Sequence, residues 1–148
     1  MITIQTYSHE EPASAYTQKE ISHFLFENLE QYGDPEKDIQ KCLDYAFGKE
    51  HKPGGLVITA TDTETQKLAG AVILNKTGME GYIPENILVY IATDKELRGK
   101  GVGKKLMQTA IDTVKGDIAL HCEPDNPAKF LYEKLGFSSK SLEMRLKK

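Results

Sequence analysis

The feature that most constrains the fold of this 148-residue chain is a glycine-rich turn between an apolar run and an amphipathic helix. The apolar run covers residues 87–92, and the turn reads Arg-Gly-Lys-Gly-Val-Gly over residues 98–103. The apolar residues of the helix recur at helical spacing, at Leu106, Met107, Ala110, Ile111 and Val114. This order predicts a strand, a turn and a helix whose first N–H groups have no intrahelical partner and can bind an anion.

Charge and glycine spacing around this turn favour a phosphate as the anion. Glycines at alternate positions let the backbone adopt a positive φ and approach a ligand closely. The helix dipole adds partial positive charge at the helix start. Four cationic side chains surround the same turn: Arg98, Lys100, Lys104 and Lys105. The sequence therefore predicts a cradle for a pyrophosphate.

Spacing separates three kinds of phosphate site. A P-loop needs a glycine five residues before the Gly-Lys pair and a hydroxyl after it, but here Arg98 and Lys105 occupy those positions. A dinucleotide fingerprint would place its third glycine at position 104, which is a lysine. The pattern Arg/Gln-x-x-Gly-x-Gly/Ala is matched without a gap by Arg98, Gly101 and Gly103. It resembles the acetyl-coenzyme A signature of the GNAT superfamily of N-acyltransferases.

A second segment, residues 125–137, resembles the other GNAT signature, a helix with a tyrosine followed by Gly-Phe. Asp125 is expected to be the N-cap, with Pro127 near the first helical position and Gly136 as the C-terminal stop. The two signatures stand in the family's order and separation. The resemblance covers most of the chain from about Leu56 onward; before that it rests on the order of elements.

Hydrophobic periodicity predicts one α/β (α+β) domain over residues 1–148. The fold implied is GNAT-like, with a mixed, mostly antiparallel sheet of six to seven strands and about four helices. Strands are expected at residues 2–7, 56–61, 68–75, 86–93, 117–122 and 142–147, and helices at 17–32, 36–48, 101–115 and 126–135. Thr17 and Glu20 are expected to form a capping box.

Charge, hydropathy and cysteine spacing argue against nucleic-acid binding, membrane spanning and metal binding. The net charge of −3 argues against nucleic acid as a partner, and no apolar segment has the length of a membrane span. Cys42 and Cys122 have no metal-ligand spacing and are expected to be reduced core residues, so no metal site is predicted. The N-terminus lacks a secretory pattern, which makes the cytoplasm the expected compartment.

The resemblance implies how acetyl-CoA would be held. Pantetheine would bind backbone groups of Ile91, Ala92 and Thr93, beside a gap between two strands. The pyrophosphate would bind the turn through residues Arg98, Gly99, Lys100, Gly101, Val102, Gly103 and Lys104. Arg98 is equally open to interpretation as a solvated charge. The family's asparagine falls at Asp125, so Asn126 is assigned the pantetheine contact and Asp125 the capping role.

The implied reaction is direct attack of an amine on the thioester, with Tyr132 as the general acid for the CoA thiolate. Backbone N–H groups near Ala92 would bind the oxyanion. The sequence leaves the general base open among Glu85, Glu123 and His121, of which Glu85 is preferred.

The acceptor would be a small-molecule or peptide amine, held between the two early helices and the loop over residues 77–85. Glu80, Tyr82 and Glu85 in that loop would attract a cation such as a polyamine, an aminoglycoside or a peptide N-terminus. The predicted function is an acetyl-CoA-dependent N-acetyltransferase; the alternative is an acyl-CoA-binding regulatory module without turnover. The resemblance also allows a homodimer, and the sequence leaves the oligomeric state open.

Overall fold

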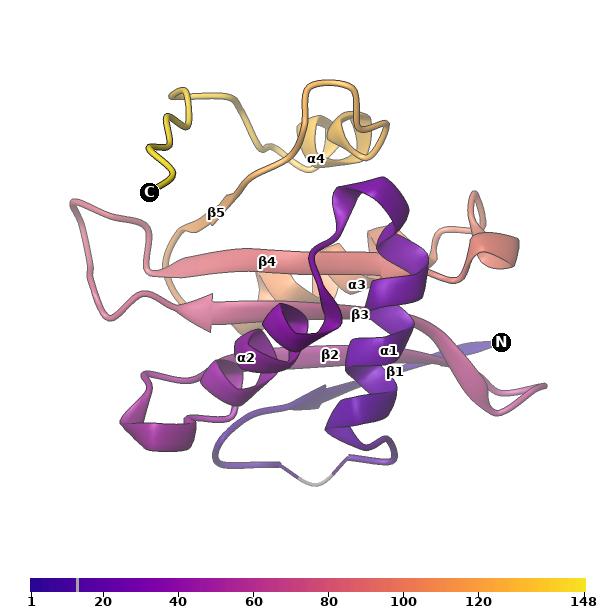
Figure 1. The fold of residues 1–148 in the computed structure, drawn as a ribbon. Coiled ribbons are helices and arrows are strands. Elements are labelled where there is room, and N and C mark those ends of the chain that lie inside the picture. The colour runs from indigo at the N-terminus through magenta and orange to yellow at the C-terminus, as the bar shows by residue number, and fades with distance from the viewer. Residues whose placement is uncertain (13) are drawn as a thin grey trace.

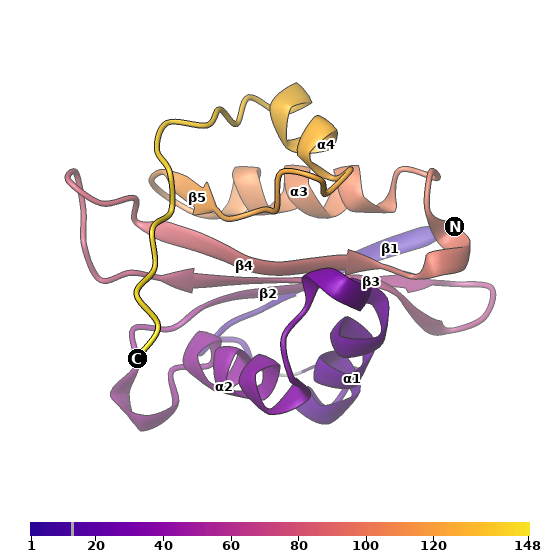
Figure 2. The ribbon, with the colours of Figure 1, turned by 45° about the horizontal axis from the view of Figure 1, so that its top comes forward.

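A single mixed sheet with helices on both faces organises the computed structural model, which describes residues 1–12 and 14–148 (Figures 1 and 2). The strand order is β1-β2-β3-β4-β5; neighbouring strands are antiparallel except β4 and β5, which are parallel. The strands are β1 (Ile2–Tyr7), β2 (Gly55–Asp62), β3 (Lys67–Lys76), β4 (Asn86–Thr93) and β5 (Ile118–Leu120). The helices are α1 (Gln18–Leu29), α2 (Glu36–Ala46), α3 (Val102–Thr113) and α4 (Lys129–Lys134).

The sheet separates two core layers, and helices cover each of its faces. Helices α1 and α2 cover one face, where Ile21, Leu25 and Leu43 are fully buried. Helices α3 and α4 lie on the opposite face, where Leu106 and Met107 are fully buried (Figure 2). The predicted mixed, mostly antiparallel sheet and the four α-helices are therefore confirmed.

The prediction of six to seven strands was wrong, because the sheet of the described residues has five. The expected last strand over residues 142–147 is a tail without secondary structure. Its apolar residues alternate with charges as in a strand, yet Leu142, Met144 and Leu146 are at least 84% exposed. Alternation predicts two faces, but a strand also needs a neighbouring backbone to bond to, and the tail lies along none.

Two helix ends also differ from the prediction. Helix α1 ends at Leu29, because Glu30 adopts a positive φ of 54° and residues Glu30–Tyr32 continue as a 3-10 turn. Helix α4 begins at Lys129, and its N-cap is Ala128 rather than Asp125. The Asn126 side chain accepts from the Ala128 N–H (2.9 Å), which holds residues before Lys129 in a turn instead of a helix.

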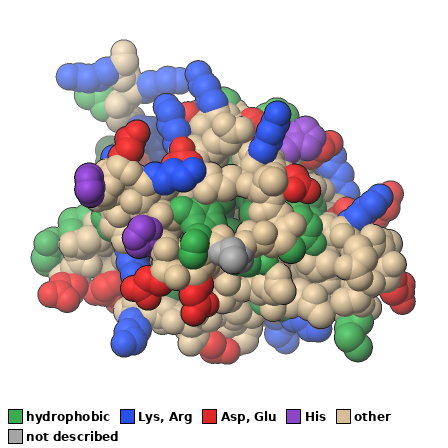
Figure 3. Space-filling view, turned by 90° about the horizontal axis from the view of Figure 1, so that it is seen from below, with side chains coloured by type: hydrophobic (Ala, Val, Ile, Leu, Met, Phe, Trp, Pro, Cys, Tyr) green, Lys and Arg blue, Asp and Glu red, His purple; other side chains and the backbone are tan. Residues whose placement is uncertain are grey.

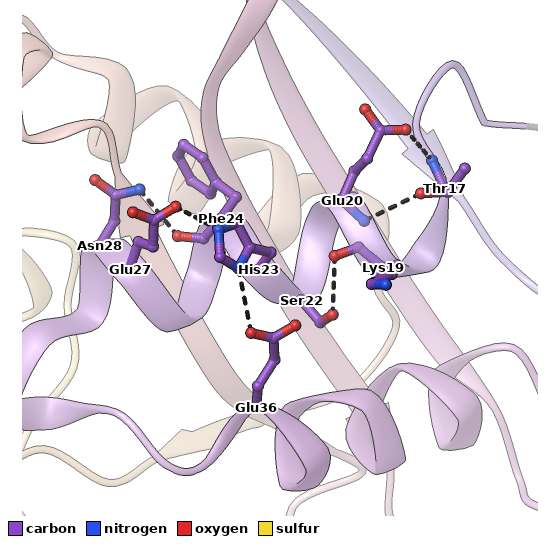
Figure 4. Close-up of polar contacts among 9 residues, drawn as sticks. All are labelled: Thr17, Lys19, Glu20, Ser22, His23, Phe24, Glu27, Asn28 and Glu36. Atoms are coloured by element: carbon purple, nitrogen blue, oxygen red, sulfur yellow. Dashed lines mark hydrogen bonds and ion pairs between the residues drawn. The ribbon is translucent and has the colours of Figure 1, made fainter.

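The expected capping box at the start of α1 is confirmed. The Thr17 hydroxyl accepts from the Glu20 N–H, and the Glu20 carboxylate accepts from the Thr17 N–H, both at 3.0 Å (Figure 4). Further along α1, His23 lies between Glu27 and Glu36, with nitrogen–oxygen distances of 2.6 and 3.2 Å (Figure 4). Because Glu36 begins α2, the protonated imidazole joins the two helices that pack together on this face of the sheet.

This imidazole makes stability depend on pH. The hydrogen bond that His23 donates to Glu36 and the charge of Glu27 raise the pKa of His23 above 6.5. The ion pairs are therefore fully present below the unfolded pKa and are lost as pH rises through the folded pKa. We expect His23→Gln to lower Tm more at pH 5.5 than at pH 8.5, measured by circular dichroism. His121→Gln, at an exposed histidine, is the matched control, and an equal loss at both pH values for His23→Gln would contradict the assignment.

A β-bulge interrupts β4 in its middle. Tyr90 is opposite Ile73 and Leu88 is opposite Leu74, which leaves Val89 without a partner on β3. Residues two apart on a regular strand share a face, but the extra residue turns Leu88 toward α3 and Tyr90 toward α1 and α2. The bulge thus changes which face of the sheet the side chains of β4 occupy, at the point where β4 stops pairing with β5.

A cavity of about 510 Å³ opens beside the N-terminal end of α1, on the face seen in Figure 3. Its lining combines apolar Ile21 and Phe47 with polar His9 and Lys49. It lies at the opposite end of α1 from the glycine turn, which contacts Asn28 and Glu30. In the part of the chain that the structure describes, no helix has the length and apolar character needed to cross a bilayer.

Candidate active site

The site begins where β4 and β5 part. β5 pairs with β4 only at Asn86, Ile87 and Leu88, whereas β3 pairs with β4 as far as Thr93. The part of β4 after the bulge therefore has a neighbouring strand on one side only, within the described residues. Its other edge offers backbone hydrogen-bonding groups that a ligand can use.

Strand geometry identifies which backbone groups face this open edge. The Asp94 N–H donates to the Ala69 carbonyl on β3 (2.9 Å). Because backbone groups alternate sides along an antiparallel strand, Ala92 also turns its N–H and C=O toward β3, while Ile91 and Thr93 turn theirs toward the gap. Of the three residues predicted to bind pantetheine, Ile91 and Thr93 thus present backbone groups to the gap and Ala92 does not.

The glycine turn follows β4 directly and faces open space. Gly99 and Gly101 have φ angles of 81° and 83°, a region that favours glycine, and a Cβ at either would meet no atom within 4 Å. Gly103 lies inside the first turn of α3, where a Cβ would touch Leu131 and Thr93 at ordinary distances. The glycines therefore shape the turn and keep its outer surface clear.

The start of α3 offers free hydrogen-bond donors to that surface. Gly101 is the N-cap and makes no side-chain cap bond, and the first helical hydrogen bond runs from the Lys105 N–H to the Gly101 carbonyl (3.1 Å). The N–H groups of Val102, Gly103 and Lys104 precede it and point out of the helix start. Three donors in one direction, at the positive end of a helix dipole, suit a phosphate group.

The four cations of the turn divide into two groups. Lys100, Lys104 and Lys105 are exposed and form no ion pair among the described residues, so they surround the helix start with positive charge. Arg98 instead pairs with Glu30 (2.8 Å) and donates to the Asn28 carbonyl (2.9 Å). It thus fastens the turn to the end of α1, a third role beside the two that the sequence left open.

Tyr132 lies buried on α4, with 7% of its surface exposed. Its helix ends in a Schellman motif: the Gly136 N–H donates to the Glu133 carbonyl, and the Phe137 N–H donates to the Tyr132 carbonyl. Gly136 has the positive φ (103°) that this motif needs. The motif brings the Phe137 ring edge-on to the Tyr132 ring at 6.2 Å, which fixes the phenol's direction.

The surroundings of Tyr132 keep the phenol neutral. Burial, with a smaller contribution from the charge of Cys122, raises the pKa of Tyr132 to about 12. A phenol with this pKa carries its proton at neutral pH and can donate it. The Cys122 side chain is half-buried and unoxidised, and it packs against the same core.

The Glu85 carboxylate, preferred from the sequence as the general base, is held by two main-chain hydrogen bonds. One carboxylate oxygen accepts from the Asp117 N–H (2.7 Å) and the other from the Gly81 N–H (2.9 Å). The Gly81 bond, followed by the Asp117 bond, lowers the pKa of Glu85. The side chain therefore anchors the β3–β4 loop to the turn before β5, and a lowered pKa makes it a weaker base.

We expect Glu85→Gln to lower Tm, because an amide cannot accept both main-chain hydrogen bonds as the carboxylate does. The pH profile of kcat should keep its shape, since the carboxylate is engaged by the backbone. Differential scanning fluorimetry and a pH series of initial rates measure the two effects, with Glu80→Gln in the same loop as control. Disappearance of an acidic limb of the profile would restore Glu85 as the base.

The two other candidate bases, His121 and Glu123, follow the end of β5 and are exposed. Near them, Asn126 is half-buried and uses its side-chain oxygen on the Ala128 N–H, which leaves the amide nitrogen for a ligand. Asp125 accepts a hydrogen bond from the Tyr32 hydroxyl at its backbone carbonyl (3.3 Å) instead of capping α4.

Three features of this region escaped the sequence-based prediction. They are the bulge at Val89, the contact of Tyr32 with Asp125, and a hydrogen bond from the Tyr90 hydroxyl to the Asp34 carboxylate (2.5 Å). Residues 33–35 read only as a helix break, and the contacts join positions 56 and 93 residues apart. No local pattern carries such a signal.

Comparison with known proteins identifies the class to which this fold and site belong. The model of the acetyltransferase (GNAT) family matches residues 14–137. The chain therefore belongs to the GNAT family, and it is an acetyl-CoA-dependent N-acetyltransferase.

The relatives differ in what their names say they acetylate. The chain is 28% identical to N-alpha-acetyltransferase 30 of Schizosaccharomyces pombe, covering 93% of this chain and 84% of that protein. It is 32% identical to glucosamine 6-phosphate N-acetyltransferase of Arabidopsis thaliana, covering 80% of this chain and 70% of that protein. An aminoglycoside N-acetyltransferase solved with coenzyme A has the same fold, with a TM-score of 0.67, 15% identity, and 100% and 95% of the two chains covered.

Proposed function

We propose that this enzyme, acting as one domain over residues 1–148, transfers the acetyl group of acetyl-CoA to a primary amine by direct attack, with Tyr132 as the general acid. The observation that carries the proposal is the buried, neutral phenol of Tyr132. Its ring is held by Phe137, in the core cluster that also contains the buried residues of α3. An acid placed in this way can protonate the CoA thiolate as the thioester C–S bond breaks.

The residues around the gap fit the cosubstrate. The open glycine turn and the free N–H groups of Val102, Gly103 and Lys104 suit a pyrophosphate, and the exposed lysines add attraction. Backbone groups of Ile91 and Thr93 on the open edge of β4, together with the Asn126 amide, suit the pantetheine arm. Arg98 does not face the ligand in this proposal; it holds the turn against the end of α1 through its ion pair with Glu30.

Within this proposal the chain's own groups divide the work of acyl transfer. An amine with a pKa near 10 is mostly protonated at neutral pH, so its proton must leave before attack. Exposed groups at the end of β5, His121 and Glu123, are open to water and can accept that proton through it. We assign no base role to Glu85, whose carboxylate is held by the backbone.

Thiol release from acetyl-CoA tests the proposed function. Purified protein is mixed with acetyl-CoA and a panel of primary amines that includes peptides with a free N-terminus, polyamines, aminoglycosides and amino sugars. Free thiol should appear in step with acetylated amine, identified by mass spectrometry. Binding of acetyl-CoA without turnover on any amine would favour an acyl-CoA-binding module instead.

A further inference from the structure

The segment between α1 and α2 carries a carboxylate in an unusual position. Asp34 lies one residue before the N-cap of α2, which is Pro35. An acidic side chain at the N-cap itself would ordinarily accept from free helical N–H groups, but proline has no such side chain. The Asp34 carboxylate accepts from the Tyr90 hydroxyl on β4, at 2.5 Å. Tyr90 is 8% exposed, whereas Asp34 is exposed, so a buried phenol holds a solvent-facing carboxylate in one place.

Three contacts hold this segment across the open part of β4. Arg98 of the glycine turn pairs with Glu30 at one end, and Asp34 bonds to Tyr90 at the other. Between them, the Tyr32 hydroxyl donates to the Asp125 carbonyl in the loop before α4. Figure 1 shows the segment crossing in front of β4 between α1 and α2. Asp34 is therefore fixed on the α1–α2 face of β4, beside the part of β4 that does not pair with β5.

The Asp34 carboxylate retains capacity for a further partner. Tyr90 bonds to Oδ2, and Oδ1 accepts no hydrogen bond from the described residues. No ion pair among the described residues includes Asp34, and Arg98 of the turn is paired with Glu30 instead. A carboxylate with its orientation fixed and one oxygen open suits an ammonium group, which supplies several donors and a full positive charge.

We infer that Asp34, oriented by Tyr90, binds the ammonium group of the amine acceptor, and that the acceptor is therefore cationic rather than a phosphorylated amino sugar. The inference rests on the proposed function and adds its substrate class. An anionic acceptor would place a phosphate near a carboxylate that forms no ion pair among the described residues, whereas a polyamine or a peptide N-terminus would be attracted.

Calorimetric titration of the protein saturated with CoA tests this inference. The probes are spermidine, a tripeptide amide with a free N-terminus, and glucosamine 6-phosphate. At least one of the two cationic probes should bind wild-type protein more tightly than the phosphorylated sugar. Asp34→Asn should weaken binding of that cationic probe about tenfold or more, because the amide keeps the shape but loses the charge.

Variants around Asp34 separate an electrostatic role from a structural one. Asp34→Glu should restore part of the affinity for the cationic probe. Tyr90→Phe should weaken binding of that probe less than Asp34→Asn does. Asp44→Asn, at an exposed carboxylate on α2, is the matched control and should bind like wild type. If the assay turns over, Asp34→Asn should raise KM for the cationic amine and leave the Kd for acetyl-CoA unchanged.

The outcomes distinguish failure of this inference from failure of the proposed function. Equal binding of the cationic probe to wild type and Asp34→Asn, tighter binding of glucosamine 6-phosphate, or no binding of either cationic probe would overturn the role of Asp34. Each of these leaves acetyl-CoA binding and acetyl transfer intact. If the wild-type protein does not bind CoA when it is prepared for the titration, the proposed function is overturned instead.

Discussion

Tyr132→Phe is expected to lower kcat by roughly 10- to 1000-fold while acetyl-CoA binds with unchanged Kd. The substitution removes one hydroxyl and keeps the ring that packs edge-on against Phe137. Because burial keeps the phenol protonated, the hydroxyl is available to donate its proton to the departing thiolate. Steady-state rates with saturating acetyl-CoA measure the effect, and calorimetry measures the affinity.

Tyr45→Phe is the matched control for the loss of a tyrosine hydroxyl. Tyr45, on α2, donates to the Lys76 carbonyl at the end of β3, and removal of its hydroxyl should leave kcat near the wild-type value. An unchanged kcat for Tyr132→Phe, with Tm and CoA affinity also unchanged, would contradict the assignment of the phenol as the acid.

Gly101→Asp is expected to weaken acetyl-CoA binding by roughly 30- to 300-fold, corresponding to about 2–3 kcal/mol of charge repulsion and lost fit. Gly101 has a φ of 83° and open space on its outer side, so the new carboxylate would project into the surface where a pyrophosphate is expected. It would also place a negative charge at the helix start.

The control for backbone strain is Gly81→Asp. Gly81 has a similar φ of 76° and open space around it, but it lies in the β3–β4 loop. Both variants should lose stability from the positive φ, whereas only Gly101→Asp should lose affinity. Wild-type Kd in Gly101→Asp would show that the anion binds somewhere other than this turn.

The sequence predicted those parts of the molecule that local chemistry determines. The capping box of Thr17 and Glu20, the glycine turn and the Gly136 stop each depend on residues close together in the chain, and each occurs as predicted. The strand over residues 86–93 was also correct, because its apolar residues need burial on a sheet.

The features that the sequence did not predict depend on contacts between distant residues. The bulge at Val89 follows from how β3 and β4 fit, and the Asp34–Tyr90 bond joins a loop to a strand 56 residues away. Glu85 has the residue type of a base, but the sequence does not show that both of its carboxylate oxygens accept from the N–H groups of Gly81 and Asp117. The tail has the pattern of a strand without a neighbouring strand to pair with.

Amide chemical shifts of the 15N-labelled protein during titration with coenzyme A test the central claim most directly. The amides of Val102, Gly103 and Lys104 should show the largest changes, followed by Ile91 and Thr93 on the open edge of β4. If saturating coenzyme A leaves the amides at the start of α3 unmoved and shifts another part of the chain, the assignment of the glycine turn as the pyrophosphate site is contradicted.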